Sequence, residues 1–402
     1  MQLKHYLDRS VYKNTDKVII FLIIVIIAFG IITLLNVTAD PFTGEESSIS
    51  DYLNNLNPMT AAVPQLLFAV VGFAILFLLL FLDYNDLRPY IKYFYWVCIG
   101  LLVIVLVYGS TINGTSGWFK LGPVSFQPSE FTKIALILSF SKILADFTEG
   151  EEAGITKLSQ LWPVLWRFLI PFLLVAVQPD FGTALVYVAI FIIILFFARA
   201  SVKIFLILAG IAGGSIPLLW MFLADWQKDR LFSFLDKSYG TADTQYQAVQ
   251  ARLAIGSGQL TGKGLFAQGS MSQLGYVPME TNDFIFSVTT ETFGFIGAAL
   301  LLVLYALLII RTIMVAMNSK DDFGTYICMG VTGMMLFHIF ENIGMNIDLM
   351  PITGIPLPFF SYGGSNLLTC LIAYSFVLNV SARRQRRQIT VTSKIMKSEL
   401  PD

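Results

Sequence analysis

Long apolar stretches with few or no charged residues recur along the whole chain and are separated by polar segments. A helix crosses the hydrocarbon layer of a membrane, roughly 30 Å thick, with about 20 residues. The stretches close to that length are Val18–Val37, Val63–Leu82, Tyr93–Ser110, Gly182–Ala198, Ile204–Leu223, Phe284–Ile310, Phe323–Met345 and Gly363–Val380. Two weaker stretches, Phe131–Leu144 and Phe168–Val177, contain or follow basic residues. With both included, the pattern predicts an all-α polytopic membrane protein with about ten transmembrane helices.

The composition supports a membrane protein and excludes several other classes. Of the 402 residues, 56% are apolar and 13% are charged, and the mean hydropathy is +0.71. A soluble domain carries roughly 25% charged residues, so a disordered chain and an ordinary soluble enzyme are excluded. The 26 basic and 27 acidic residues balance, and nothing indicates a nucleic-acid partner. The three cysteines lie in apolar stretches without paired spacing, which argues against disulfides and a zinc site.

The basic residues predict how the helices are oriented, because lysine and arginine concentrate on the cytoplasmic side of membrane proteins. The first stretch lacks a cleavage signature and is interpreted as a retained span. We therefore divide the chain into a leader (1–17), a membrane domain (18–382) with a long external loop (225–282) between helices seven and eight, and a tail (383–402). Both termini are predicted to be cytoplasmic, since basic residues precede the first stretch and follow the last: Lys4, Arg9, Lys13, Lys17, Arg383, Arg384, Arg386 and Arg387. The acidic segment 38–60 is then external.

Ionisable residues at membrane depth mark either a function or a buried pair, because they are costly there. Glu130 and Lys133 stand three residues apart, hence on one helix face, and Pro128 suits the start of that helix. They are equally consistent with a structural ion pair and with a functional site. Asp180 lies on a very short external turn, where it either caps the following helix or pairs with Lys133.

Asp283 is a third candidate, at the point where the long external loop enters the next helix. As an N-cap its carboxylate would accept backbone N–H bonds and feel the positive helix end, which predicts a lowered pKa. An ionised carboxylate there is compatible with a general base. Glu291 lies about two turns further along the same helix, where a bare carboxylate is expensive.

Two glycine-bearing segments complete the predicted external face. Gly256-Ser257-Gly258 and Gly262-Lys263-Gly264 lie in the long loop, and a glycine-rich loop with a lysine is able to approach a phosphate. The segment 354–364 contains two prolines and cannot be a continuous helix, so we expect it to be buried in protein or to line a cavity. His338 is interpreted as a hydrogen-bonded intramembrane residue. No Asp-x-Asp pair faces outward, which disfavours a metal-dependent nucleotide-sugar enzyme.

Four ordered motifs together resemble the SEDS family, the shape, elongation, division and sporulation proteins of bacteria. The resemblance covers nearly the whole chain and is closer to the elongation members than to the division members. The motifs are Phe126-Gln127-Pro128-Ser129-Glu130, Gln178-Pro179-Asp180-Phe181-Gly182-Thr183, Asp283-Phe284-Ile285-Phe286 and Pro356-Leu357-Pro358-Phe359-Phe360-Ser361-Tyr362-Gly363-Gly364.

The resemblance implies a peptidoglycan glycosyltransferase that polymerises lipid II at the outer face of the cytoplasmic membrane. The essential aspartate of the family matches Asp283, which would deprotonate the acceptor GlcNAc 4-hydroxyl, with undecaprenyl diphosphate as the leaving group. The intramembrane acid and lysine of the family match Glu130 and Lys133, and its external aspartate matches Asp180. The remaining residues expected at the substrate are Lys263 and Arg252 near the diphosphate, with Gln127, Trp118, Glu291 and Ser361 in support.

Cofactors and partners follow from the same resemblance. A divalent cation, magnesium or manganese, would share the stabilisation of the diphosphate, although no closed set of metal ligands is visible in the sequence. The expected partners are membrane lipid, a class B penicillin-binding protein acting as transpeptidase, and MreC-like and MreD-like proteins of the elongation complex.

The chain departs from the family pattern at three places, and three other functions stay open. Asn282 and Thr281 precede Asp283 where a threonine preceded by histidine is common, Gly117 precedes Trp118 where an arginine is frequent, and a threonine follows Glu291. The loss of the arginine puts one diphosphate contact in doubt or moves it to Lys120. The alternatives are a lipid II flippase, a division-type paralogue and a non-catalytic scaffold. A flippase typically shows internal repeats, and none is apparent here.

Overall fold

The computed structural model describes residues 14–38, 61–112, 115–122, 124–148, 154–223, 225–236 and 242–384. Most of the predicted leader, the acidic segment from residue 39 to 60 and most of the predicted tail lie outside these ranges, as do the expectations attached to them. The domain boundaries therefore stay a prediction.

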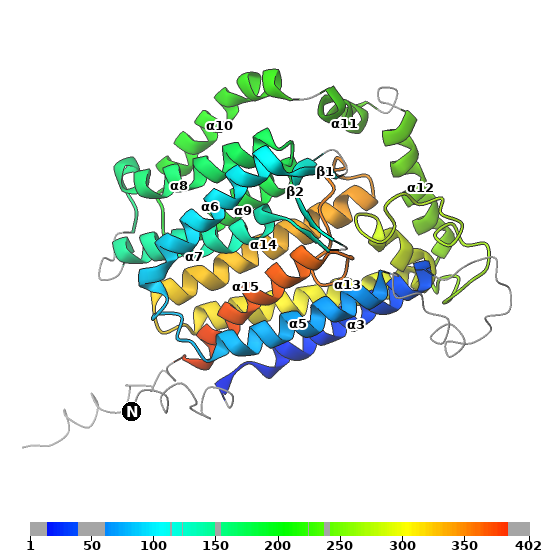
Figure 1. Ribbon diagram of the computed structural model, residues 1–402, viewed down its shortest axis with the longest axis horizontal. Helices are drawn as coiled ribbons and strands as arrows, with labels where there is room; N and C mark the ends of the chain where they lie inside the picture. The colour runs from blue at the N-terminus through cyan, green and yellow to red at the C-terminus, as the bar shows by residue number, and fades with distance from the viewer. Residues whose placement is uncertain are drawn as a thin grey trace, which may run out of the picture.

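Each predicted apolar stretch lies in a helix of the described residues (Figure 1). Helix η1 (Arg88–Tyr90) is a short 3-10 turn that leads into α6. The long helices, in chain order, are α3 (Lys17–Thr38), α5 (Ala62–Leu80), α6 (Ile91–Tyr108), α7 (Pro128–Thr148), α8 (Leu158–Val177), α9 (Phe181–Phe197), α10 (Val202–Phe222), α13 (Ile285–Met317), α14 (Asp322–Asn346) and α15 (Gly364–Ala382).

The predicted class, an all-α polytopic membrane protein, is confirmed. In the described part of the chain, seven helices are long and apolar enough to cross a membrane: α3, α5, α6 with η1, α8, α13, α14 and α15. Helix α9 is shorter, and α7 carries several charged residues. For these two helices and for α10, a membrane crossing therefore stays a prediction.

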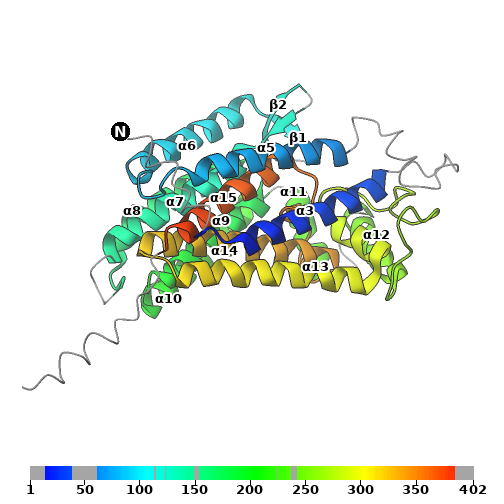
Figure 2. The ribbon, with the colours of Figure 1, turned by 90° about the horizontal axis from the view of Figure 1, so that it is seen from below.

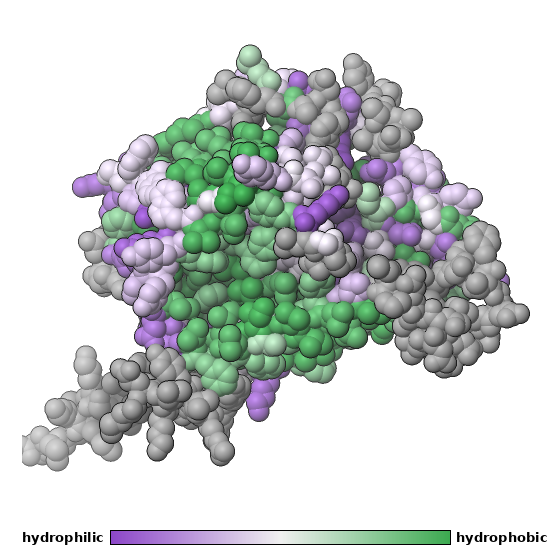
Figure 3. Space-filling model, viewed as in Figure 1, coloured by the Kyte–Doolittle hydropathy of each residue, from purple (hydrophilic) through white to green (hydrophobic). Residues whose placement is uncertain are grey.

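Helices α14 and α15 form the centre of the bundle and are buried over most of their length. Helix α14 packs against α7, α9 and α13, and α15 packs against α5. The side-on view in Figure 2 shows α3, α5 and α6 along the outside of the same bundle. These outer helices expose large apolar side chains, and Figure 3 shows the apolar band that they form. Such a continuous apolar surface is costly in water and favourable in lipid.

Helix α8 begins ten residues earlier than predicted, because its prolines and Arg167 do not interrupt it. Pro171 has no N–H to donate to the carbonyl of Arg167, and the hydroxyl of Tyr95 on α6 donates to that carbonyl instead, at 3.1 Å. The Arg167 side chain in turn donates to the carbonyl of Pro163 at 2.8 Å. A proline is tolerated inside a membrane helix when a neighbouring helix satisfies the backbone group that it frees.

A small antiparallel sheet that the sequence did not predict follows α6. Its strands β1 (Ser110–Ile112), β2 (Thr115–Leu121) and β3 (Val124–Phe126) lie in the order β1-β2-β3. Lys120 pairs with Ser125 in the β2–β3 register. The sheet lies at the end of α6 and leads directly into α7, so it fixes the entry of the chain into that helix.

The long loop before α13 contains two helices, α11 (Asp225–Leu235) and α12 (Ala242–Gly258). After α12 the chain docks on α13 where Gly294, with a φ of 68°, interrupts the helix. The freed backbone groups of α13 bond to the loop: the N–H of Phe295 donates to the carbonyl of Gln259 at 2.9 Å, and the N–H of Lys263 donates to the carbonyl of Glu291 at 2.9 Å. The kink and the loop therefore satisfy each other.

Candidate active site

Asp283 lies two residues before the start of α13 and is half-buried. Its backbone carbonyl accepts two hydrogen bonds from α14, from Asn342 Nδ2 at 2.9 Å and from Asn346 Nδ2 at 3.0 Å. The hydroxyl of Ser361 donates to the neighbouring carbonyl of Asn282 at 2.7 Å. The backbone at Asp283 is thus held from two sides. Ser361, expected in support, acts on the backbone beside Asp283.

The expected N-cap role of Asp283 is wrong. The residue that precedes the first helical turn is Phe284, and among the described residues no backbone N–H donates to the Asp283 carboxylate. Burial instead raises the pKa of Asp283 to about 6, against the lowering effect of the Arg230 guanidinium. The prediction of a lowered pKa failed because Asp283 does not cap α13 and because burial outweighs the nearby positive charge. A carboxylate with a pKa just below neutrality is ionised at pH 7 and is a stronger base than an ordinary aspartate.

Arg230 on α11 is a neighbour of Asp283 that the sequence reasoning missed. Its Nη1 donates to the carbonyl of Ile352 at 3.1 Å. Together with Arg252 of α12 it lines a cavity of about 100 Å³, in which Arg252 forms an ion pair with Asp348 at 2.9 Å. No local pattern distinguished Arg230 from the other basic residues of the loop, since only the folding of α11 toward Asp283 brings it there.

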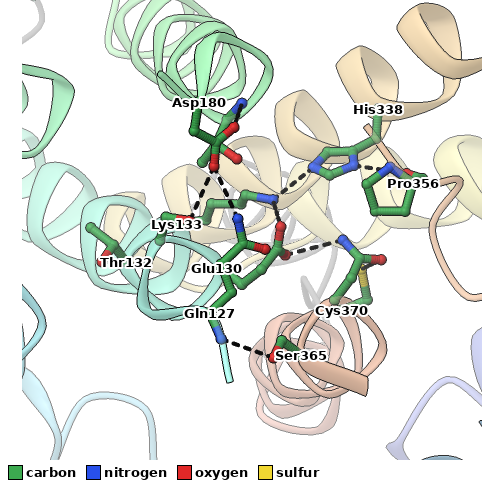
Figure 4. Close-up of polar contacts among 12 residues, drawn as sticks. Gln127, Glu130, Thr132, Lys133, Asp180, His338, Pro356, Ser365 and Cys370 are labelled. Carbon is green, nitrogen blue, oxygen red and sulfur yellow. Dashed lines mark hydrogen bonds and ion pairs between the residues drawn. The ribbon is translucent and has the colours of Figure 1, made fainter. Parts of the chain in front are cut away.

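Glu130 and Lys133 form the buried ion pair that their spacing predicted, with Lys133 Nζ at 2.7 Å from Glu130 Oε1 (Figure 4). The same ammonium lies 3.0 Å from His338 Nε2, and Asn366 donates to Glu130 Oε2 at 3.1 Å. Only 1% of the Lys133 side chain is exposed. The structure therefore directs Lys133 toward protein partners.

Asp180 caps α9, as one of the two alternatives predicted, by accepting the N–H of Thr183 at 3.1 Å. Its other carboxylate oxygen accepts a hydrogen bond from Gln127 Nε2 at 3.0 Å. Burial raises the pKa of the Asp180 carboxyl. Asp180 and Gln127 thus belong to the same buried cluster as Glu130, joined through the start of α7 (Figure 4).

Glu291 has several partners and is not a bare carboxylate. Lys263 Nζ lies 2.6 Å from its Oε1, and the N–H groups of Met271 and Ser272 donate to its two oxygens at 2.7 and 3.0 Å. The glycine-bearing loop around Lys263 is therefore fastened to α13. About a third of the Lys263 side chain, 31%, stays exposed.

The remaining expected residues lie near the small sheet. Trp118 is half-buried in β2, where its Nε1 donates to the hydroxyl of Thr115 at 3.2 Å. Gly117 faces Gln178, because a Cβ at this position would lie 3.0 Å from the Gln178 side-chain oxygen. Lys120, the residue considered in place of the missing arginine, is exposed.

The described residues do not fit a protein-built metal centre. Among them, no group of three or more histidine, cysteine, aspartate or glutamate side chains is close enough to hold an ion. The carboxylates named above are instead paired with basic or amide groups or stand singly.

The comparisons with known proteins agree with the motifs. Residues 16–386 match the family of cell cycle proteins FtsW, RodA and SpoVE. The chain is 35% identical over 303 residues to the peptidoglycan glycosyltransferase MrdB of Escherichia coli K12, covering 75% of this chain and 80% of that protein. It is 36% identical over 320 residues to the stage V sporulation protein E of Bacillus subtilis 168, covering 79% of this chain and 86% of that protein.

Two solved structures are similar over 92% of the chain. One is the rod shape determining protein RodA of Thermus thermophilus, with 28% identity, a TM-score of 0.66 and 98% of that chain covered. The other belongs to a peptidoglycan synthase complex that coordinates polymerization and crosslinking, with 27% identity, a TM-score of 0.71 and 99% of that chain covered. With the family match spanning nearly the whole chain, this protein belongs to the FtsW/RodA/SpoVE family, the SEDS family that its motifs indicated.

Proposed function

We propose that this peptidoglycan glycosyltransferase polymerises lipid II at the outer face of the cytoplasmic membrane, with Asp283 as the general base. The observation that carries the proposal is the half-buried Asp283 carboxylate, whose pKa burial raises to about 6. It accepts the proton of the acceptor GlcNAc 4-hydroxyl while that oxygen forms a bond to C1 of the donor MurNAc. The bond from C1 to the phosphate oxygen breaks, and undecaprenyl diphosphate leaves as an anion.

General base assistance of this kind contributes typically about 10²–10⁴ in rate. The leaving diphosphate needs nearby positive charge. Arg252 and Lys263 are suited to it, because both are partly exposed, at 40% and 31%, although each is also paired with a carboxylate. Arg230 adds a third cation beside Asp283.

The cellular setting is proposed from the relatives. A similar chain works in a peptidoglycan synthase complex that coordinates polymerization and crosslinking, which supports a class B penicillin-binding protein as the partner. We place this protein in the elongation branch, with MreC-like and MreD-like proteins in the same complex. Both termini are proposed to be cytoplasmic.

The proposal is tested by polymerisation of purified lipid II in detergent, with the transpeptidase partner present and its active site blocked. Asp283→Asn keeps the size of the side chain and removes the base, so glycan synthesis should fall at least about 100-fold while the protein stays folded. Near wild-type synthesis by Asp283→Asn would place the base elsewhere. If neither protein makes polymer and the wild type moves lipid II across liposomes, the flippase alternative replaces the proposal.

A further inference from the structure

Three polar side chains recur at every fourth position along buried α14: His338, Asn342 and Asn346. Such spacing puts them on one face of the helix. Asn342 Nδ2 donates both to the carbonyl of Ile355, at 2.8 Å, and to the carbonyl of Asp283, at 2.9 Å. Asn346 adds its bond to the carbonyl of Asp283. The side chains on this face of α14 therefore donate hydrogen bonds to backbone carbonyls of other segments, including the carbonyl of Asp283.

His338, on the same face of α14, contacts the carbonyl of Pro356 and also the buried ion pair. Its Nδ1 lies 3.2 Å from the carbonyl oxygen of Pro356, and its Nε2 lies 3.0 Å from Lys133 Nζ (Figure 4). An ammonium has donors only, so Nε2 accepts and the single ring proton is on Nδ1, where it is donated to Pro356. The contact with Lys133 thus sets the tautomer that binds the carbonyl.

The backbone bound by these side chains is the segment Ile352–Pro356, named here the strap. Besides His338 and Asn342, it is held by Arg230 at the carbonyl of Ile352 and by Glu341, which accepts the hydroxyl of Thr353 at 2.9 Å. The strap lies directly beside the catalytic carboxylate: Gly354 turns with a φ of 74°, and a Cβ built on it would lie 3.4 Å from Asp283 Oδ2. A displacement of the strap would therefore change the space around the Asp283 carboxylate.

We propose that His338 is a positioning residue, through which the buried Glu130–Lys133 pair fixes the strap against Asp283. In this assignment Lys133 acts on the reaction through His338 and not by touching the diphosphate. The closed contacts of Lys133 explain why an intramembrane cation is 1% exposed in a protein whose substrate is anionic. The inference rests on the proposed role of Asp283 as the base.

The test compares three variants on α14 in the lipid II polymerisation assay, with kcat and KM measured separately. His338→Phe removes both ring-nitrogen contacts and should lower kcat about 10- to 100-fold with KM changed less than about twofold, since a displacement of about 1 Å near the chemistry costs on that order. His338→Gln carries one donor and one acceptor and should recover most of the lost kcat. Thr332→Val removes a buried hydroxyl that bonds only within α14, to the carbonyl of Cys328, and should leave both constants unchanged.

Gly354→Ala tests the strap without touching the buried cluster, because Gly354 is exposed. It should lower kcat in the same way as His338→Phe, since alanine is strained at this φ and the strap lies beside Asp283. This variant carries the test if His338→Phe fails to fold, as judged by its thermal unfolding in detergent.

Each result decides the inference. A kcat within about twofold of wild type for either His338→Phe or Gly354→Ala overturns it. A rise in KM at unchanged kcat, or no recovery with glutamine, also overturns it, because a direct contact between the ion pair and the substrate or a mere packing role would give those results. Asp283→Asn runs beside them: if it polymerises like wild type, the proposed base fails, whereas inactive Asp283→Asn with fully active His338→Phe rejects the strap alone.

Discussion

At the scale of the residue, the chemistry of Asp283 is set by two opposing influences. Burial disfavours its charged form and raises its pKa, and the Arg230 guanidinium partly restores the charged form. The result is a carboxylate that is ionised at neutral pH and still able to take a proton from a hydroxyl. The nearest carboxyl in the sequence is that of Glu280. Burial and the negative charge of Glu291 raise its pKa further, to about 8. Glu280 is therefore mostly protonated at pH 7, which agrees with the proposal that Asp283 is the base.

The acid limb of the pH profile follows from this balance. Because the base must be ionised, kcat/KM should be constant above about pH 7 and fall tenfold per pH unit below about pH 6. Arg230→Gln removes the charge that lowers the Asp283 pKa, so the limb should move to higher pH, by about one unit. The measurement is the initial rate of glycan synthesis at low lipid II from pH 5 to 8.

Arg252→Gln is the matched control for that profile. It also removes an arginine from the cavity wall, but its ion-pair partner is Asp348, and it has no influence on the Asp283 pKa. It should raise KM for lipid II and leave the position of the acid limb unchanged. Equal shifts in the two variants would show that general electrostatics, and not the specific neighbour Arg230, sets the pKa.

At the scale of the element, the docking of α12 and the following loop on α13 depends on glycines that face backbone. A Cβ at Gly258 would lie 2.0 Å from the carbonyl oxygen of Thr290, whereas a Cβ at Gly256, on the same helix, would meet nothing within 4 Å. Since backbone cannot move aside as a flexible side chain does, α12 approaches α13 only because residue 258 has no side chain. Arg252 is carried by this helix, so its place in the cavity depends on the same contact.

The two glycines give a paired prediction. Gly258→Ala should lower the thermal unfolding midpoint in detergent and weaken lipid II binding, with a cost of about 1–3 kcal/mol for the forced shift. Gly256→Ala should keep or slightly raise the midpoint, since alanine is favoured in a helix by about 1 kcal/mol. A fall of the same size in both variants would mean that the close approach to Thr290 does not explain the loss, because Gly256 has no such contact.

At the scale of the whole molecule, the two ends of α13 lie in chemically different surroundings. The end near Glu291 carries the loop helices, the strap and Asp283, whereas the other end carries Asp321, which accepts hydrogen bonds from Tyr84 and Asn85. Asp83 and Arg383 form an ion pair there at 3.1 Å. Beyond the kink at Gly294, the remaining part of α13 up to Met317 is roughly 35 Å long, enough to cross the bilayer. The reacting groups thus gather at one end of the bundle.

Cysteine labelling tests which end faces outward. The native Cys98, Cys328 and Cys370 are buried, so a membrane-impermeant maleimide should label the wild type poorly in intact cells. Gln268→Cys, in the exposed loop near Glu291, should be labelled without permeabilisation. Asn318→Cys, exposed at the far end of α13, should be labelled only after permeabilisation. The reverse pattern would contradict the proposed orientation.

The sequence by itself determined the class of the molecule and much of its helical layout. Transmembrane helices are encoded by length and apolarity over contiguous residues, so the apolar stretches predicted helices, and Pro128 and the proline-rich segment marked where helices begin and end. Spacing within one helix placed Glu130 and Lys133 on the same face, where they form an ion pair, and the cap was one of the two roles expected for Asp180. The family was recognisable because its motifs are short and contiguous.

Only the tertiary structure decided the environment of those groups, because contacts between distant segments leave no local pattern. The pKa of Asp283 depends on burial by other elements and on Arg230, more than 50 residues earlier. Helix α8 continues through Pro171 because Tyr95 of α6 satisfies the freed carbonyl. His338 was expected to be a hydrogen-bonded intramembrane residue, which is confirmed, but only folding decided that Lys133 lies on one ring nitrogen and Pro356 on the other. The sequence determines which side chains are present, whereas tertiary packing determines which of them are in contact. Their reactivity depends on those contacts.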